Sequence, residues 1–320
     1  MSNLPLFPDR PTELASRLAE LARRNVWIGT SSWKYPGWIG QIYTAERYAT
    51  RGRFSQKKFE ANCLAEYAET FPIVCGDFSF YQFPSVEYWQ RLIGGTPASF
   101  RFALKVPEMV TVKRFPAHPR YGQRGGLTNE SFLDVELLSE LFLAPLAAHG
   151  EKVALLIFEF GSFSRADFAS VAGFAEALDG FLKKLPRQCR YAVEIRNREY
   201  LDPVYFECLR HHRVAHVFNA WTRMPPIDQQ IQIPEAFTTD FTVTRALLRV
   251  GRTYEKAVAQ FAPYSAIQDP NPPARAAMRS LIEQVTDPER AAYIFVNNRF
   301  EGNAPATIAG IAGCSEEDAG

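Results

Sequence analysis

The sequence predicts an α/β protein whose fold is a TIM-type (β/α)8 barrel. Short β-type runs alternate with amphipathic helix-type segments from residue 26 to the C-terminus. These runs number eight, which is the strand count of this barrel. The chain has 320 residues, enough for the roughly 250 residues that such a barrel uses. A doubly wound sheet is the alternative, but no G-x-G-x-x-G or Walker loop follows a predicted strand.

The elements predict one barrel domain with a helical extension. The extension covers residues 1–25, the barrel 26–312 and a C-terminal tail 313–320. A helix predicted over 11–24 is amphipathic, so we expect it to close the barrel floor or to contact a partner. The apolar stripe of this helix consists of Leu14, Leu18 and Leu21.

Amphipathic helix-type segments lie between the predicted strands. The strands are Val26–Thr30, Ile73–Phe78, Arg101–Lys105, Val153–Phe158, Tyr191–Ile195, Val214–Phe218, Thr242–Leu248 and Ala292–Val296. The helix-type segments between them include Lys58–Thr70, Asn129–Ala148, Ser164–Lys184, Asp202–His211 and Ala274–Val285. This order is typical of β-α units around a parallel sheet.

Composition and charge exclude several classes of protein. With 36 basic and 35 acidic residues the net charge is +1, so no global field attracts nucleic acid or membrane. The longest apolar run, Val153–Phe158, is far shorter than the roughly 20 residues of a membrane span. Charged residues near the N-terminus argue against a secretory signal, which predicts a cytoplasmic protein. Five cysteines without a C-x-x-C pair suggest neither a disulfide framework nor a zinc ribbon.

Charged side chains alternate with apolar ones in two of the predicted strands. Along 100–105, Arg101 and Lys105 share one face while the phenylalanines occupy the other. Along 191–196, Glu194 and Arg196 lie on one face in the same way. Because unpaired buried charges cost several kcal/mol, we expect these groups to pair inside the barrel or to reach solvent at its mouth.

Several motifs together resemble the YecE-like family, domain of unknown function 72. The opening segment is Ile28–Trp33 followed by Tyr35–Trp38 and Tyr43. Further matches are Asp77–Tyr81 with Pro84, Phe100–Lys105, Val193–Asn197 and Phe295–Asn298 with Gly302, Ala304 and Pro305. The resemblance implies a TIM-type barrel over nearly the whole chain and assigns no activity.

The chain departs from the family pattern at two places. Cys75 stands where the family usually has a carboxylate, and Asp77 where it has an amide. After the third strand, 111–113 read Thr-Val-Lys without the histidine that many members carry. A mechanism that requires that glutamate or that histidine would not operate here.

The candidate site lies at the C-terminal ends of the strands, where barrels of this class place their active sites. We assign Glu194 as the general acid or base, with Asp77 as a second carboxylate and Lys105 as a catalytic cation. Strict alternation places Arg245 on the same face as Val243, an argument against its assignment. The candidate ligand-binding residues are Ser31, Trp33, Tyr35, Trp38, Tyr81, Arg196, Asn219, Trp221, Arg245, Asn297 and Asn298.

Other interpretations of these charges remain open. The charged groups can instead form an internal ion-pair layer that holds the barrel closed. Lys105 could act as a Schiff-base lysine if neighbouring arginines lower its pKa. No histidine cluster has ligand spacing, so we predict neither a metal site nor an organic cofactor, although Asp77 and Glu194 leave a carboxylate-held Mg²⁺ open.

Two loops after strands are rich in basic residues. Residues 34–58 and 105–124 together contain eleven Lys and Arg but only Glu46 and Glu108 as acidic residues. Aromatic residues stand between these charges, a mixture that suits base stacking and phosphate binding. The alternative is a solvated basic rim whose aromatic rings pack under their own loops.

These observations predict an enzyme, a hydrolase or lyase, that acts on a phosphorylated small molecule or nucleic acid at the C-terminal face. A non-catalytic protein that binds nucleic acid or a phospholigand is one alternative. A sugar-handling barrel is another, favoured by the tryptophans and disfavoured by the excess of Arg and Lys. No membrane partner is expected, and the oligomeric state is left open.

Overall fold

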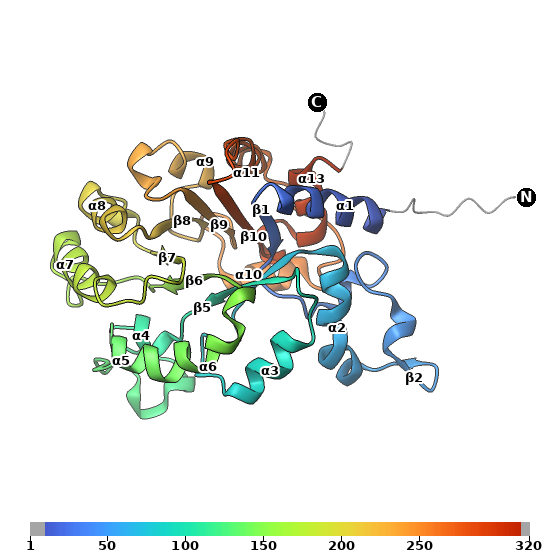
Figure 1. The fold of residues 1–320 in the computed structure, drawn as a ribbon, viewed down its shortest axis with the longest axis horizontal. Helices are drawn as coiled ribbons and strands as arrows, with labels where there is room; N and C mark the ends of the chain where they lie inside the picture. The colour runs from blue at the N-terminus through green and yellow to red at the C-terminus, as the bar shows by residue number, and fades with distance from the viewer. Residues whose placement is uncertain (1–9, 315–320) are drawn as a thin grey trace, which may run out of the picture.

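Eight parallel strands close into a barrel in the computed structural model, which describes residues 10–314. Around the barrel the order is β1-β10-β9-β8-β7-β6-β5-β4. Figure 1 shows the strands at the centre with the helices outside them. The strands are β1 (Val26–Thr30), β4 (Ile73–Gly76), β5 (Arg101–Lys105), β6 (Val153–Glu159), β7 (Tyr191–Glu194), β8 (Ala215–Ala220), β9 (Phe241–Ala246) and β10 (Ala291–Val296). The TIM-type barrel is confirmed, and all eight predicted strands are present.

The helices fill the connections between the strands. They are α1 (Arg10–Arg23), α2 (Gln56–Thr70), α3 (Val86–Gly94), α4 (Glu108–Thr111), α5 (Val135–Leu138), α6 (Ala144–Leu146), α7 (Val171–Leu182), α8 (Pro203–His212), α9 (Ile227–Gln230), α10 (Tyr254–Phe261), α11 (Pro272–Glu283), α12 (Asn298–Glu301) and α13 (Ala304–Ala312). A short hairpin of β2 (Ala49–Thr50) and β3 (Arg53–Phe54) lies between β1 and α2. None of the helices within residues 10–314 is long and apolar enough to cross a membrane.

Helix α1 packs on the outside of the barrel. It contacts α2, α13 and β1, and its predicted stripe of leucines is buried. Arg17 Nε donates to Ala312 O (3.1 Å), which fixes the helix beside α13. The helix therefore lies among the outer helices. Residues 1–9 and 315–320, parts of the predicted extension and tail, lie outside the described residues.

Two predicted elements differ from the structure because of local side chains. The second strand, β4, ends at Gly76 and not at Phe78. The Phe78 ring folds back onto Gly76, so closely that a Cβ at position 76 would lie 2.0 Å from the ring. The helix predicted over 129–148 is divided into α5, a π turn (Ser139–Leu143) and α6. Pro145 has no N–H and would clash with a regular helical turn, which accounts for the wider turn before it.

Alternation along the strands separates two apolar clusters. One faces the helices and contains Phe100, Phe102, Val193 and Ile195, as the sequence predicts. The other fills the barrel interior with smaller side chains such as Cys75, Ala103 and Ala192 beside Phe241, Tyr293 and Phe295. The interior cluster stops short of the strands' C-terminal ends, and polar residues continue the inward faces there.

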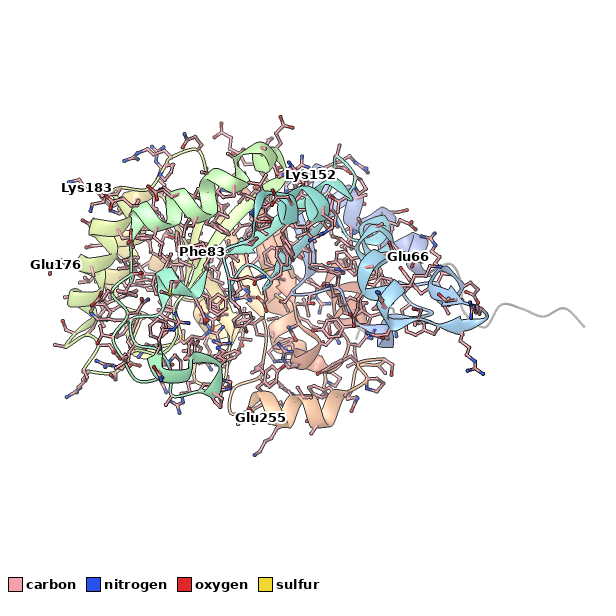
Figure 2. All side chains as sticks on the ribbon, turned by 90° about the horizontal axis from the view of Figure 1, so that it is seen from below. Glu66, Phe83, Lys152, Glu176, Lys183 and Glu255 are labelled. Carbon is pink, nitrogen blue, oxygen red and sulfur yellow. The ribbon has the colours of Figure 1, made fainter. Side chains whose placement is uncertain are left out.

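Figure 2 shows the two ends of the barrel on opposite sides of the molecule. Lys152, which precedes β6, lies at the top, and Glu255 on α10, which follows β9, lies at the bottom. The lower side in this view is therefore the mouth, formed by the C-terminal ends of the strands.

Candidate active site

Six charged side chains form one network of ion pairs at the mouth. They are the cations Lys105, Arg196 and Arg245 and the carboxylates Asp77, Glu159 and Glu194. Glu159 Oε2 lies at the centre, 2.8 Å from Lys105 Nζ, 2.6 Å from Arg245 Nη1 and 3.1 Å from Arg196 Nη2. With three positive and three negative groups, the network is electrically balanced.

The remaining pairs close the network around Glu159. Asp77 Oδ1 lies 3.2 Å from Lys105 Nζ and 3.5 Å from Arg245 Nη2. Glu194 accepts from Arg196 through Nε (2.9 Å) and Nη2 (2.8 Å), and its other oxygen accepts from Arg245. Each carboxylate therefore pairs with at least two cations.

Strand register brings these residues together. Glu159 lies opposite Glu194 in the β6–β7 pair, and Arg245 lies opposite Asn219 in the β8–β9 pair. Alternation does place Arg245 on the face of Val243, but Val243 belongs to the interior cluster. The argument against Arg245 was therefore wrong, because the face it shares with Val243 points into the barrel.

Burial is nearly complete for most of the network. The Glu194 side chain is 0% exposed and Arg245 2%, whereas Asp77 is 39% exposed. Burial opposes ionisation of Glu159, but the charges of Arg196, Lys105 and Arg245 outweigh it and hold the pKa of this carboxyl well below its usual range. Asp77 is thus the member of the network that solvent or a ligand can reach.

Lys105 is held in its charged form. Burial favours the neutral amine, but the carboxylates of Asp77 and Glu159 outweigh it and raise the pKa of Lys105 above its ordinary value. A Schiff-base lysine needs a lowered pKa, so the electrostatics oppose that interpretation. The ammonium group also lies 3.7 Å from the centroid of the Phe80 ring.

Arg101, which the sequence groups with these charges, lies elsewhere. It stands at the start of β5, four positions before Lys105, and strands rise about 3.3 Å per residue. Its guanidinium donates to Ala98 O (2.7 Å) and lies 5.8 Å from the centroid of the Trp27 ring. Arg101 therefore belongs to the opposite end of the barrel and takes no part in the network.

Several predicted ligand-binding residues lie beside the network. Trp221 packs its ring against Arg196, 3.5 Å from the guanidinium carbon. Buried polar atoms without a hydrogen-bond partner in the structure also gather at these strand ends: Ser31 Oγ, Asn219 Oδ1, Arg245 Nε and Asn298 Nδ2. Buried polar atoms are normally satisfied, so each of these four atoms can still form a hydrogen bond with a water molecule or a ligand.

Other predicted residues have structural contacts. Trp38 is fully buried and its Nε1 donates to Asn298 Oδ1 (3.1 Å). Asn297 Oδ1 caps α12 by accepting from the backbone N–H of Arg299 (3.0 Å). Trp33 is buried, while Tyr81 is 59% exposed. The structure therefore does not gather these aromatic residues into one exposed platform.

The two basic loops do not form a single surface. Figure 1 shows the β2–β3 hairpin at the right edge of the molecule, whereas α4, which lies within the second loop, and α5, which follows it, are at the lower left. Part of the charge is also paired, as Arg47 contacts Glu69 and Arg120 contacts Glu108.

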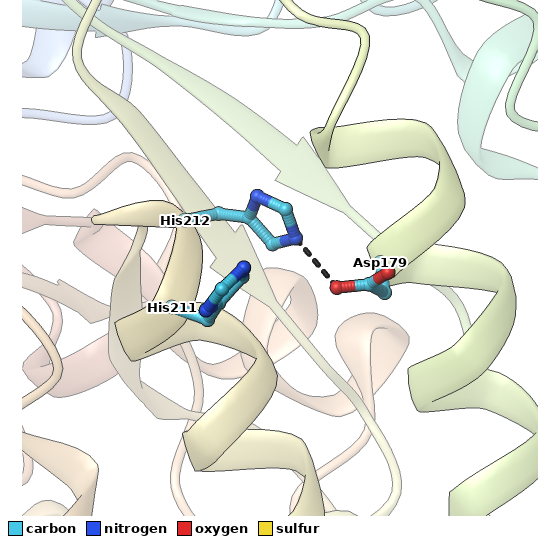
Figure 3. Close-up of side chains that lie close together, drawn as sticks. All are labelled: Asp179, His211 and His212. Atoms are coloured by element: carbon cyan, nitrogen blue, oxygen red, sulfur yellow. Dashed lines mark hydrogen bonds and ion pairs between the residues drawn. The ribbon is translucent and has the colours of Figure 1, made fainter.

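Metal ligands come together in one place among residues 10–314. Asp179 of α7 and the pair His211 and His212 of α8 have donor atoms within 4.8 Å of one another (Figure 3). His212 Nε2 lies 2.7 Å from Asp179 Oδ1, so these two side chains already pair with each other. Sequence spacing missed this group because Asp179 comes from another helix. It lies where α7 and α8 end, away from the mouth.

The carboxylates of the mouth do not fit a Mg²⁺ ion. Oxygens of Asp77 and Glu194 face Arg245, and Glu159 faces three cations. A divalent cation would have to displace these groups and would be repelled by them. The carboxylates of the mouth are thus arranged to pair with its three cations.

Glu159 belongs to the site, although the sequence analysis did not assign it. It ends the run 153–159, where alternation puts it on the face of Leu155 and Ile157, the inward face. Its position at a strand end was visible, but its contact with three cations depends on neighbouring strands.

The fold and the mouth define a (β/α)8-barrel protein with a charged network at the C-terminal ends of its strands. The family described as "Protein of unknown function DUF72" matches residues 27–318, and the chain belongs to this family. The YecE-like resemblance is thereby confirmed.

One curated protein and two solved structures show how far the chain has diverged from other members of this kind. UPF0759 protein YunF of Bacillus subtilis (strain 168) is 28% identical over 182 residues, 57% of this chain and 54% of that protein. The chain thus matches about half the length of this curated relative. Among solved structures, the DUF72 protein TM1631 of Thermotoga maritima MSB8 has a TM-score of 0.58 at 19% identity, covering 91% of this chain and 99% of that one. The DUF72 protein EF0366 of Enterococcus faecalis V583 has a TM-score of 0.56 at 15% identity, covering 91% and 97%. These likenesses concern the fold.

Proposed function

We propose that the barrel mouth is the active site of an enzyme, a hydrolase or lyase, that acts on a phosphorylated small molecule. The observation that carries this proposal is the partly exposed carboxylate of Asp77 within an otherwise buried network of cations and carboxylates. A carboxylate that solvent can reach, held beside two cations, suits proton transfer to or from a bound ligand.

Asp77 is the proton-transfer group in this proposal. Lys105 and Arg245, which contact it, stabilise negative charge that develops on the ligand. Glu194 is fully buried with both oxygens bonded, so it acts as a positioning residue that orients Arg196 and Arg245. Glu159 holds the same cations and Lys105 in place.

A small ligand is favoured over a polynucleotide. A nucleic-acid surface needs a continuous basic stripe, and the two basic loops lie on different sides of the barrel (Figure 1). A sugar platform is not favoured either, since Trp33 and Trp38 are buried. A polynucleotide as the preferred ligand remains an outcome of the experiment below.

The test uses ³¹P NMR to detect conversion of phosphorylated compounds. The panel holds sugar phosphates, nucleotides and an oligonucleotide, and we expect the protein to convert one of the small molecules, detected as a new ³¹P NMR signal. Preferential conversion of the oligonucleotide would contradict the small-molecule assignment. Asp77→Asn should lower that rate by about 10²-fold or more while the protein stays folded. Because Asp77 is 39% exposed, the melting temperature of this variant should fall by less than that of Glu194→Gln. Asp240→Asn, an exposed aspartate that directly precedes β9 at the other end of the barrel, is the matched control. Equal rates for Asp77→Asn and wild type contradict the assignment.

A non-catalytic phospholigand-binding protein is the second candidate. The balance of three cations and three carboxylates favours this candidate, because a balanced network can hold the barrel closed without taking part in a reaction. Binding of a panel member without any conversion would support this candidate and contradict the enzyme proposal.

A further inference from the structure

Arg299 is a cation near the mouth that lies outside the balanced network. Among the described residues, 10–314, it forms no ion pair. Its Nε is buried and has no hydrogen-bond partner. A partly buried guanidinium without a carboxylate has lost water without gaining an opposite charge, so it is suited to bind an anion.

Arg299 lies on the same side of the mouth as Asp77. It follows β10, Asp77 follows β4, and β1 lies between these two strands in the barrel. Tyr35, in the loop after β1, is influenced by both. Burial raises the pKa of Tyr35, Arg299 opposes this rise, and Asp77 adds to it. Both the unpaired cation and the exposed carboxylate therefore act on Tyr35, whose loop follows the strand between theirs.

Tyrosines surround Arg299. Its guanidinium carbon lies 4.5 Å from the ring centroid of Tyr254, which is 50% exposed. Tyr264 contacts Tyr35 edge to face, with ring centroids 5.5 Å apart. Burial raises the pKa of Tyr264, and the nearby charge of Arg299 opposes this rise. Tyrosine hydroxyls can donate to phosphate oxygens beside a guanidinium.

The segment that carries Tyr264 is fixed to its surroundings. Tyr264 has φ +69°, a left-handed conformation that a non-glycine residue adopts only where its surroundings hold it. Asn303 Nδ2 donates to Tyr264 O (2.8 Å), and Gln41 Nε2 donates to Ser265 O (2.6 Å). Gly37 packs so closely that a Cβ there would lie 1.9 Å from Pro263 O. The backbone of Tyr264 is therefore held in place before a ligand binds, which lowers the entropy cost of binding.

We propose that Arg299, with the hydroxyls of Tyr254 and Tyr264, forms the subsite that binds the phosphate group of the ligand. This inference rests on the proposed function and names the group that recognises its substrate. Other cations near the mouth already have carboxylate partners: those of the network pair within it, and Arg249 and Arg252 both pair with Asp269. The loops after the seventh and eighth strands, β9 and β10, also bind phosphate in many barrels, a fold-level analogy in support.

The test measures binding of inorganic phosphate at low ionic strength by titration calorimetry. Arg299→Gln should weaken phosphate binding at least about tenfold. Arg299→Lys keeps the charge but loses the planar fork, so we expect an intermediate loss and a melting temperature close to that of wild type. Arg187→Gln, an exposed arginine before β7 at the other end of the barrel, should bind as wild type does.

Asp77→Asn separates this inference from the catalytic proposal. It removes a negative charge near the subsite, so phosphate binding should be equal or tighter while turnover falls. Loss of phosphate binding in Arg299→Gln without any turnover in the wild type would support the subsite and contradict the enzyme. Three results would overturn the subsite: no phosphate binding by the wild type, equal binding by Arg299→Gln, or tighter binding of acetate than of phosphate.

Discussion

Replacing Glu194 by Gln should destabilise the barrel strongly. The substitution conserves volume but leaves three cations facing two carboxylates, and an amide N–H₂ would face the donors of Arg196 or Arg245. Removing one partner of a buried ion pair costs about 3–5 kcal/mol. With about 2.1 cal/mol/K of unfolding entropy per residue, a chain of 320 residues loses about 0.7 kcal/mol per degree, so the melting temperature should fall by about 4–7 °C.

Calorimetric melting at pH 7 measures this loss. Glu176→Gln, on the exposed side of α7 (Figure 2), is the matched control and should change the melting temperature by less than about 1 °C. Adding Arg245→Met to Glu194→Gln restores the balance of charge, so the double variant should be less destabilised than the sum of the two single variants. A fall below about 2 °C for Glu194→Gln would refute the reasoning that this network stabilises the barrel.

Two further changes test other parts of the structure. Burial lowers the pKa of His216 to about 3, below its unfolded value near 6.5, so its contribution to stability is full above pH 6.5 and falls as the pH drops toward 3. Urea unfolding should therefore show the wild type losing about 2 kcal/mol between pH 7.5 and pH 5 that His216→Asn does not lose; parallel pH profiles would contradict this. Gly37→Ala forces a Cβ against Pro263 O and should cost about 1–3 kcal/mol and weaken phosphate binding by displacing Tyr264. Gly94→Ala, with open space around its Cβ position, should be nearly neutral in the same melting and binding measurements, and an equal loss in both glycine variants would argue against the close contact.

The sequence by itself determined the elements and much of the site. Alternation with a period of two is a local property, so it revealed the strands and placed Lys105, Glu194 and Arg196 on the inward face. It failed where one side chain changed the backbone, as with Phe78 beside Gly76 and with Pro145 in the connection between β5 and β6.

Tertiary structure alone decided which charges meet. Glu159 contacts three cations because strand register and barrel closure bring β5, β7 and β9 around the end of β6. Arg299 stands on a short helix after β10, where no periodic pattern marks it, and its lack of a carboxylate partner is visible only once the neighbouring loops are in place. Pairing and burial depend on residues far apart in the chain, whereas sequence periodicity reports only on near neighbours.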